Sequence, residues 1–562
     1  MRVTGATAAC LVLAVLGGLL RASGVHRGND PIRFHPDEIH YAGVAQQLTP
    51  DDLDPHRFEN PPLLTYALYG ARALHASLAG EAASRDWIEA GGLYEVARWI
   101  GVVLGAATAL VVAATARRLF GPAEAVAAAA VVALSFLHGR DSHFGVNDVP
   151  MVFLVAAALW CSIRAWLGGS RAWLYAAAAL AGLAAATKYN GAAAVVLPVA
   201  ALALRREPAA RAGTRAVALH LLPLGAVFLA GFVAGNPYSL LAFEEFRAGF
   251  VNQYVWWGDR HHFGQSSASA PVLYAQASLA LVGWAHLAAA VAGAALVLAR
   301  DRRLAALLLA FPLFYLAGMW SKTLFFWRFA LPLLPFVALL AACGWVELSR
   351  RLAGRGARAG ATGTPWATLA VLLAVGSAEP AARLVRHDQL LHREATWSQA
   401  RDWVLANVPP GSALFFEGYP PEYPAIEAAY RAYTPRQRID RLEFAGRHAG
   451  PDGGPAIDGG GWLLTDSRYE ASWRNERDAA YWDAFYAQIR ALYPLVAEFP
   501  PGPHGDPQPF VSDTLYSPLV DLWSIDRPGH TIRIWRIPPG EWRPPPGIPV
   551  ETSVSDTDDE PR

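Results

Sequence analysis

Long apolar segments recur along the first two-thirds of the chain and are separated by short polar connections. A bilayer core about 30 Å thick requires roughly 20 apolar residues in a spanning helix. By this criterion the pattern predicts about eleven spans. They lie near residues 5–23, 93–116, 123–138, 148–167, 172–187, 190–204, 216–236, 272–299, 304–320, 328–346 and 366–380. We therefore expect a polytopic α-helical membrane protein.

Arginines fall in alternate connections between these segments. They are Arg117, Arg118, Arg171, Arg205, Arg206, Arg211, Arg215, Arg300, Arg302, Arg303, Arg350, Arg351, Arg355 and Arg358. Because basic residues concentrate in cytoplasmic loops, we expect a multi-pass protein of the cell (inner) membrane with a cytoplasmic N-terminus. The first outer loop is then 25–92, and the chain after about residue 381 is extracytoplasmic. No clear small-x-small cleavage site precedes Val25, so the first segment is expected to be an uncleaved span.

Residues 62–79 are largely apolar but contain Arg72 and His75. Counting them as a span would place the Arg117–Arg118 connection on the outer face, against the positive-inside rule. We therefore interpret this segment as an amphipathic helix at the outer interface. A twelfth span is the alternative.

The sequence changes character after the last span. A helical segment closed by Pro409-Pro410-Gly411 precedes a short strand, and GGWLLTDSRY and HTIRIWRI have strand patterns, with a helical pattern near 475–493 between them. We expect a membrane domain over 1–386, a small extracytoplasmic α/β domain over 387–540, and a disordered acidic tail over 541–562.

The composition agrees with membrane insertion. Apolar residues make up 54% of the chain and charged residues only 17%, whereas soluble proteins have about a quarter charged. The 47 basic and 47 acidic residues balance, so nothing indicates nucleic-acid binding. Cys10, Cys161 and Cys343 lie inside apolar segments, so we expect no disulfide framework.

Acidic residues in two predicted outer loops are the first candidates for chemistry. Asp37 and Glu38 begin a helical pattern in RFHPDEIHYAG, and Asp148 precedes the fourth span in GRDSHFGVNDVPM. Each has a structural alternative, since a carboxylate in a first turn stabilises the helix dipole and an aspartate can cap a helix. Charges at the lipid boundary are nevertheless costly unless they face a cavity or a cation. We expect Asp37 and Asp148 to converge on one cavity.

Cationic candidates lie on the same predicted face. Lys188 and Lys322 are the only lysines in the chain, and a lysine near the outer interface is suited to binding a phosphate. Snorkelling at a helix end is the alternative, and we favour it for Lys322. Arg98 and Arg328 are further candidates. Arg140, Asp141 and His143 form either an internally paired interfacial cluster or part of the site.

These motifs resemble those of the GT-C superfamily of polytopic glycosyltransferases, over roughly residues 5–346. The similarity is strongest to the protein O-mannosyltransferase type (glycosyltransferase family 39) and the aminoarabinose transferase type. It rests on Asp37-Glu38, Pro61-Pro62-Leu63, the segment 140–148, Thr187-Lys188-Tyr189 and Arg328-Phe329-Ala330-Leu331-Pro332. It implies a sugar donor on a polyprenyl phosphate, used on the outer leaflet. Asp37 would be the base or the residue that orients the acceptor, and Asp148 would correspond to the second acidic motif.

One position departs from the family pattern. Some relatives have a lysine directly before the Pro-Pro pair, where it meets the lipid phosphate, and this chain has Asn60 there. The phosphate-binding role is therefore assigned to Lys188, Arg98 or Arg328, with Tyr189, Arg140 and His143 as further substrate-binding candidates. Mg²⁺ or Mn²⁺ could bridge carboxylates and phosphate, but no ligand set is recognisable and no metal ligand is assigned.

The chemistry expected is transfer of a sugar to a hydroxyl acceptor with inversion, because a polyprenyl phosphate is a good leaving group and the acceptor needs a base. The acceptor is a protein, a polysaccharide or a lipid. The aromatic loop 237–271, with Trp256, Trp257, His261 and His262, lines the acceptor side or forms an interfacial belt. Other functional classes compatible with the chain are a lipid or solute transporter and a non-catalytic membrane scaffold.

Overall fold

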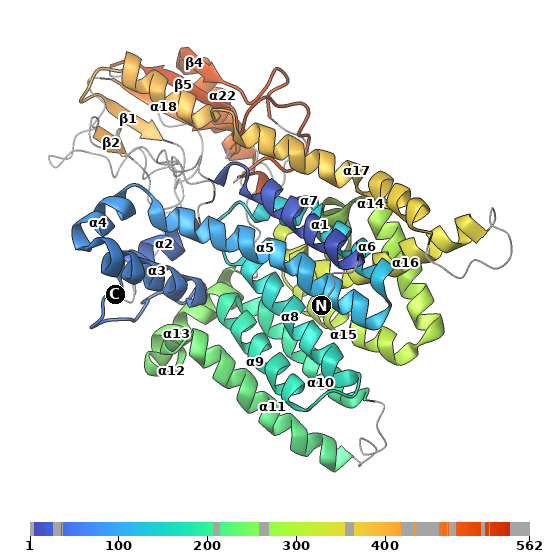
Figure 1. Cartoon of the computed structure of the whole chain (residues 1–562). Coiled ribbons are helices and arrows are strands. Elements are labelled where there is room, and N and C mark those ends of the chain that lie inside the picture. The colour runs from blue at the N-terminus through green and yellow to red at the C-terminus, as the bar shows by residue number, and fades with distance from the viewer. Residues whose placement is uncertain are drawn as a thin grey trace. The chain divides into compact units, whose positions relative to one another are not determined.

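The computed structural model describes residues 5–25, 35, 37–205, 214–257, 269–354, 365–416, 431–433, 460–468, 470, 479–506, 512–515 and 517–539. The chain forms two compact units (Figure 1). The first unit comprises Met1–His262, Ser267–Arg393 and Val511–Trp523. The second comprises Phe263–Ser266, Glu394–Phe510 and Ser524–Arg562. The segment 511–523 thus packs with residues that precede it by hundreds of positions.

Apolar helices dominate the first unit. Those long enough to cross a membrane are α1 (Gly5–Ala22), α5 (Gly92–Leu119), α8 (Asp148–Trp166), α14 (Ala270–Arg300), α15 (Arg302–Met319), α16 (Leu334–Gly354) with the preceding 3-10 helix η5 (Trp327–Leu333), and α17 (Trp366–Leu391). Shorter apolar helices are α6 (Pro122–Ala133), α9 (Ala172–Thr187), η2 (Tyr189–Val195) continuing into α10 (Val196–Ala203), and α11 (Thr214–Gly235). Each of the eleven predicted spans coincides with one of these, and the polytopic helical fold is confirmed.

Short helices lie between the apolar ones. They are α2 (Glu38–Gln47), α3 (Leu63–Ala79), α4 (Glu81–Glu89), α7 (Phe136–Asp141), α12 (Tyr238–Leu241), α13 (Phe243–Val251) and the π-helix η4 (Asn252–Trp257). The helix α3 corresponds to the segment 62–79 and is not among the membrane-span candidates of the described residues. A twelfth span at this place therefore has no support.

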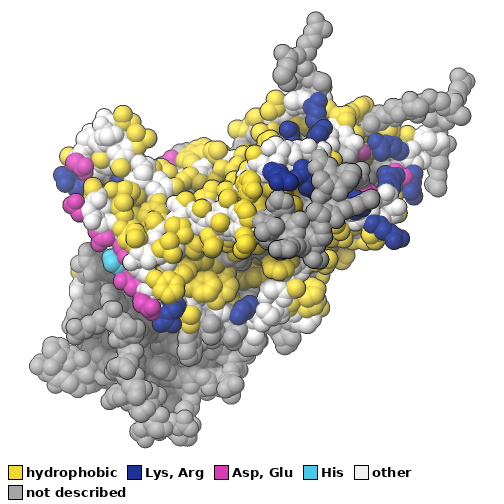
Figure 2. Space-filling view, turned by 90° about the horizontal axis from the view of Figure 1, so that it is seen from below, with side chains coloured by type: hydrophobic (Ala, Val, Ile, Leu, Met, Phe, Trp, Pro, Cys, Tyr) yellow, Lys and Arg dark blue, Asp and Glu magenta, His cyan; other side chains and the backbone are white. Residues whose placement is uncertain are grey.

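The outer surface of the helices is apolar. Figure 2 shows a broad hydrophobic face with Lys and Arg side chains gathered towards one end and Asp and Glu towards the other. Large apolar side chains on several helices are more than half exposed, among them Val15, Leu19, Val103, Val291 and Val375. In water such a surface would favour aggregation, whereas in a bilayer these side chains contact lipid.

Small residues allow the helices to approach closely. Gly293 of α14 and Gly344 of α16 lie against each other's helix, and a Cβ atom at Gly344 would meet the backbone carbonyl of Ala289. Glycine at both positions removes this obstacle. Close backbone approach at small residues is the usual way in which membrane helices associate, because lipid provides no hydrophobic driving force between them.

A buried arginine holds the start of the connection between α6 and α8. Arg21, in the last turn of α1, is 0% exposed. Its guanidinium donates to the carbonyl oxygens of Val132 (3.0 Å) and Ala133 (2.8 Å), at the end of α6, and to His138 Nδ1 (2.9 Å). Helix ends leave backbone carbonyls that need such partners, so Arg21 fastens α1 to the connection that carries α7.

The second unit contains a five-stranded sheet of order β2-β1-β3-β5-β4. Its strands are β1 (Ala413–Phe416), β2 (Arg431–Tyr433), β3 (Gly461–Asp466), β4 (Leu495–Phe499) and β5 (Ile532–Ile537). Strand β1 is parallel to β2 and β3, whereas β5 is antiparallel to β3 and β4. The accompanying helices are α18 (Thr396–Asn407) and α22 (Ala479–Leu492).

The core of this unit forms where α18 packs on the sheet. Ala400 and Val404 of α18 contact Leu414, Leu464 and Ile534 from three different strands. The predicted helices and the strands β1, β3 and β5 are confirmed. The strands β2 and β4 were missed because β2 has only three residues and β4 has only five, between a proline and a proline-rich turn.

Candidate active site

Four segments of the first unit carry the charged residues of the site. Asp37 and Glu38 begin α2, and Asp148 begins α8. Lys188 lies between α9 and η2 with an extended backbone (φ −152°, ψ 129°), and Arg328 is on η5. Both cations therefore occupy irregular backbone within or beside apolar helices. Such breaks in membrane proteins occur where the backbone is buried in protein or lines a cavity.

Glu38 and Arg98 form a fully buried ion pair. The two side chains are 0% exposed, and Arg98 donates to both carboxylate oxygens, from Nε (2.9 Å) and Nη2 (2.7 Å). Glu38 Oε1 also accepts the backbone N–H of Gly145 at 2.7 Å. This carboxylate therefore joins α2 to α5 and to the connection that precedes Asp148.

Asp37 has a different environment. Its carboxylate is 33% exposed and lies 3.4 Å from Nη2 of Arg328. His35 lies beside both residues, with Nε2 2.6 Å from Arg328 Nη1 and Nδ1 3.7 Å from the Asp37 carboxylate. A guanidinium can only donate, so Nε2 accepts from Arg328, and the backbone N–H of Asp37 donates to Nδ1 at 3.1 Å.

His35 remains neutral near neutral pH. Burial, followed by the positive charges of Arg328, Arg140 and Lys188, lowers the pKa of His35 well below its ordinary value. The residue is 1% exposed. A neutral imidazole leaves the positive charge of Arg328 available to Asp37 and to an incoming anion.

Lys188 and Asp148 form a further ion pair of the site, beside that of Asp37 and Arg328. Lys188 Nζ lies 2.6 Å from Asp148 Oδ1, with the lysine side chain 15% exposed and the aspartate 3%. The ammonium group also lies 5.5 Å from the centre of the Phe329 ring. Because Phe329 directly follows Arg328, both ion pairs adjoin the same 3-10 helix.

Tyr41 is a buried tyrosine of α2. It is 2% exposed, and its pKa is raised well above the ordinary value, first by burial and then by the negative charges of Asp37 and Asp148. Tyr41 was not predicted as a site residue.

The segment 512–523 supplies structural contacts to this region. The carboxylate of Asp513 accepts the backbone N–H groups of Trp327 (2.6 Å) and Arg328 (3.4 Å) at the start of η5. Asp513 is 0% exposed. It satisfies donors that a helix start otherwise leaves unpaired and so holds the backbone that carries Arg328.

Arg140 is held by the same segment. Its guanidinium donates to the carbonyl oxygens of Asp513 (2.7 Å), Ser517 (3.1 Å) and Pro518 (3.2 Å), and to the carboxylate of Asp141 (3.1 Å). Burial raises the pKa of Asp141 to about 6, and Arg140 opposes this effect while Asp513 and Asp148 add to it. Arg140 therefore orders the connection between α7 and α8.

The remaining predicted residues lie outside the ion pairs Asp37–Arg328 and Asp148–Lys188. Asn60 is half-buried before α3, Tyr189 donates to the carbonyl of Phe58 (2.7 Å), and His143 lies 3.2 Å from Asp388. Lys322 donates to the carbonyl of Tyr254 (2.9 Å). His261 and His262 lie outside the described residues, as do the side chains of Trp256 and Trp257.

Two groups of side chains among the described residues have the composition of a metal site. One consists of His143, His387 and Asp388, and the other of Asp54, His56 and Glu245. Neither contains Asp37 or Asp148, each of which faces a basic side chain of the protein.

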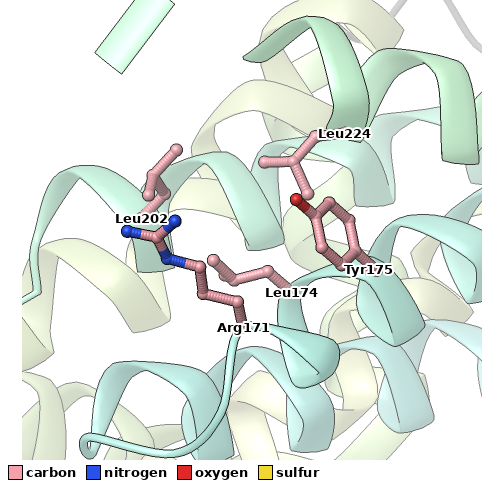
Figure 3. A pocket seen from close by; sticks show the side chains of 5 residues that line it. All are labelled: Arg171, Leu174, Tyr175, Leu202 and Leu224. Carbon is pink, nitrogen blue, oxygen red and sulfur yellow. The ribbon is translucent and has the colours of Figure 1, made fainter. Parts of the chain in front are cut away.

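A small hollow lies elsewhere in the first unit. Figure 3 shows it between α9, α10 and α11, and its lining consists of Arg171, Leu174, Tyr175, Leu202 and Leu224. None of these five residues is a carboxylate, and none belongs to the two ion pairs. The hollow is therefore distinct from the charged cluster.

Comparisons with known proteins agree with this architecture. Residues 90–234 match the family described as dolichyl-phosphate-mannose-protein mannosyltransferase. No curated protein matches the chain. The structure is similar to that of ArnT from Cupriavidus metallidurans bound to undecaprenyl phosphate, with 16% identity, 86% of this chain and 96% of that chain covered, and a TM-score of 0.53.

Two archaeal structures are also similar. The apo oligosaccharyltransferase of Archaeoglobus fulgidus has 13% identity over 94% of this chain and 88% of that chain, with a TM-score of 0.51. AglB from the same organism, in complex with an inhibitory peptide and a dolichol-phosphate, has 14% identity over 88% and 73%, with a TM-score of 0.50. At these identities the likeness establishes the fold. The family match over residues 90–234 covers about a quarter of the chain, and together these comparisons show a multi-pass membrane fold similar to that of these proteins.

Proposed function

We propose that this enzyme transfers a sugar from a polyprenyl-phosphate carrier to a hydroxyl acceptor on the extracytoplasmic face of the cell membrane, with inversion at the anomeric carbon. Two similar structures support a lipid-linked donor, since the ArnT structure holds undecaprenyl phosphate and the AglB structure holds a dolichol-phosphate. The transporter alternative is not favoured. The observation that carries the proposal is the exposure of Asp37, at 33%, beside Arg328 in an otherwise buried charged cluster.

Asp37 acts as the general base. Its carboxylate takes the proton from the acceptor hydroxyl, and the acceptor oxygen attacks the anomeric carbon. The bond between that carbon and the phosphate oxygen breaks, and the phosphate leaves with the bonding electrons. Because the leaving group is a stable anion, no acid is needed to protonate it. A single displacement of this kind inverts the configuration.

Lys188 and Arg328 stabilise the departing phosphate. Preorganised cations in a site with little water stabilise developing charge strongly. Asp148 orients Lys188 through their 2.6 Å contact. The assignment of Lys188 and Arg328, with Asn60 in the position where some relatives have lysine, is consistent with the irregular backbone that carries both cations.

Glu38 and Arg98 hold Asp37 in position and take no part in proton transfer. All oxygens of the Glu38 carboxylate are already engaged by Arg98 and Gly145. The pair fixes the start of α2, and with it Asp37, against α5. We assign the same kind of role to Arg140 through its contacts with residues 513–518.

The orientation follows from charge. The connections rich in arginine are assigned to the cytoplasm, so the N-terminus is cytoplasmic and the α/β domain, proposed over 387–540, is extracytoplasmic. The site then opens to the outer leaflet, where polyprenyl-phosphate sugars are available to acceptors outside the cell.

The test is a donor assay with the purified full-length protein in detergent. Lipid-linked sugars carrying a radiolabel are offered with protein, polysaccharide and lipid-glycan acceptors, and the anomeric configuration of any product is determined. We expect one donor to be consumed, with an inverted product. Asp37→Asn should give no product, while Asp51→Asn, an exposed carboxylate of the same loop, should retain activity. A product of retained configuration would contradict the single displacement.

A further inference from the structure

A cluster of two histidines and one aspartate lies outside the proposed catalytic machinery. His143 follows α7, and His387 and Asp388 lie in the last turn of α17. Their side chains are 1%, 0% and 9% exposed. One ligand-type atom from each, Nε2 of His143, Nδ1 of His387 and Oδ1 of Asp388, lies within 4.8 Å of the other two.

None of these three atoms has a hydrogen-bond partner among the described residues. His143 Nε2 is 3.2 Å and His387 Nδ1 is 3.8 Å from Asp388 Oδ1. Buried polar atoms are rarely left without a partner. Three such atoms from separate side chains are placed so that they can share one cation.

In each histidine ring, the nitrogen that faces away from the cluster fixes the tautomer. His143 Nδ1 lies 2.9 Å from the carbonyl oxygen of Gly139, which can only accept, so the proton is on Nδ1 and Nε2 carries a lone pair. His387 Nε2 lies 2.7 Å from Ser517 Oγ and can donate to it, which leaves a lone pair on Nδ1. In this state two lone pairs and a carboxylate oxygen converge.

This arrangement is that of a metal centre. Histidine ligands usually donate their second ring N–H to a carbonyl or another acceptor, which orients the ring towards the metal. Ligand atoms around tetrahedral zinc, at about 2.0–2.2 Å from the metal, are roughly 3.3–3.5 Å apart. The separations of 3.2 and 3.8 Å bracket this value.

We infer that His143, His387 and Asp388 bind a divalent transition metal, with Zn²⁺ as the probe of choice for a set of two imidazoles and one carboxylate. The metal would tie the connection that leads to Asp148 to the end of α17. It would also compensate the buried negative charge of Asp388. This inference concerns metal binding and does not depend on sugar transfer.

The test measures metal bound to the full-length protein in detergent. The protein is stripped with a chelator, loaded with Zn²⁺, dialysed and analysed by mass spectrometry for metal content and by thermal unfolding. We expect about one tightly bound Zn²⁺ per chain and a higher midpoint of unfolding in the loaded protein. His143→Gln, His387→Gln and Asp388→Asn should each weaken binding at least about tenfold.

His56→Ala is the matched control. His56 belongs to the second His-and-acid group, where its side chain is 59% exposed, and this variant should retain the metal. Should the ligand variants fold poorly, Co²⁺ loaded into the unaltered protein gives an independent readout through the absorption bands of a tetrahedral site. Absence of tight metal binding by the unaltered protein would overturn the inference, as would full retention of metal in the three ligand variants.

Discussion

Two carboxylates that are neighbours in the sequence have opposite environments. Glu38 is fully buried, pairs with Arg98 through both oxygens and accepts a third hydrogen bond. Asp37 is one-third exposed and has a longer contact, 3.4 Å, with Arg328. The Glu38 carboxylate is 0% exposed, so an acceptor hydroxyl cannot reach it, whereas Asp37 is partly open to solvent. From this comparison we assign a stabilising role to Glu38 and the catalytic role to Asp37.

The largest effect on stability is expected from breaking the buried pair. Glu38→Gln leaves the guanidinium of Arg98 buried without its counter-charge, and such a loss costs about 3–5 kcal/mol. Thermal unfolding in detergent should show a large drop in the midpoint, and activity should fall only with the amount of folded protein. Unchanged unfolding with lost activity would reverse the roles of Glu38 and Asp37.

Lys188→Ala should impair donor use more than folding. Loss of a charged contact to phosphate is expected to lower kcat/KM for the lipid-linked sugar about 10- to 100-fold. The substitution also leaves Asp148 without its counter-charge. The double variant Lys188→Ala with Asp148→Asn separates the loss of stability from the loss of donor use. It should regain stability without regaining donor use. Lys322→Ala is the matched control and should retain kcat/KM. Equal losses of folded protein and activity in the double variant would contradict the assignment.

Asp513→Ala tests positioning through the backbone. Removal of a helix cap costs about 1 kcal/mol, and we expect roughly a fivefold lower turnover because the backbone of Arg328 loses its anchor. Asp521→Asn, an exposed carboxylate of the same segment, is the control. Initial rates at saturating donor provide the measurement. Equal rates in the two variants would show that Asp513 does not position Arg328.

The smallest effect concerns pH. The pKa of His35 is lowered in the folded state by burial and by Arg328, Arg140 and Lys188, so the unfolded chain binds the proton first as pH falls. Stability is therefore complete above about pH 6.5 and is lost below it, by at most about 1.4 kcal/mol per pH unit. Unfolding midpoints from pH 7.5 to 5.5 should fall less steeply in His35→Gln. Identical slopes would show that His35 is not responsible.

Much of the fold could be predicted because it depends on local apolar length. The spans and strands β1, β3 and β5 are visible as uninterrupted or alternating patterns. Asp37, Asp148, Lys188 and Arg328 could be named because charge at a membrane boundary is costly and therefore informative. Which cation faces which carboxylate could not be predicted, since the pairs join residues 40 to 291 positions apart.

Other contacts had no signal in the sequence. His35 lies in the same short motif as Asp37, and its proximity could have suggested a role. Asp513 could not have been suggested, because it reaches η5 from 185 residues away in a segment that shows no pattern of its own. His143 was predicted to bind substrate, a prediction that no comparison tests. The structure places it beside His387 and Asp388, at the end of a span predicted only for its hydrophobicity.

The most direct test of the division between the two carboxylates is a paired measurement on Asp37→Asn. Single-turnover transfer from the lipid-linked donor and thermal unfolding are recorded on the same purified sample. Removal of a general base should slow transfer by about 10²- to 10⁴-fold, while the unfolding midpoint stays close to that of the unaltered protein because Asp37 is partly exposed. Transfer at an unaltered rate by the folded variant would contradict the central claim that Asp37 is the base.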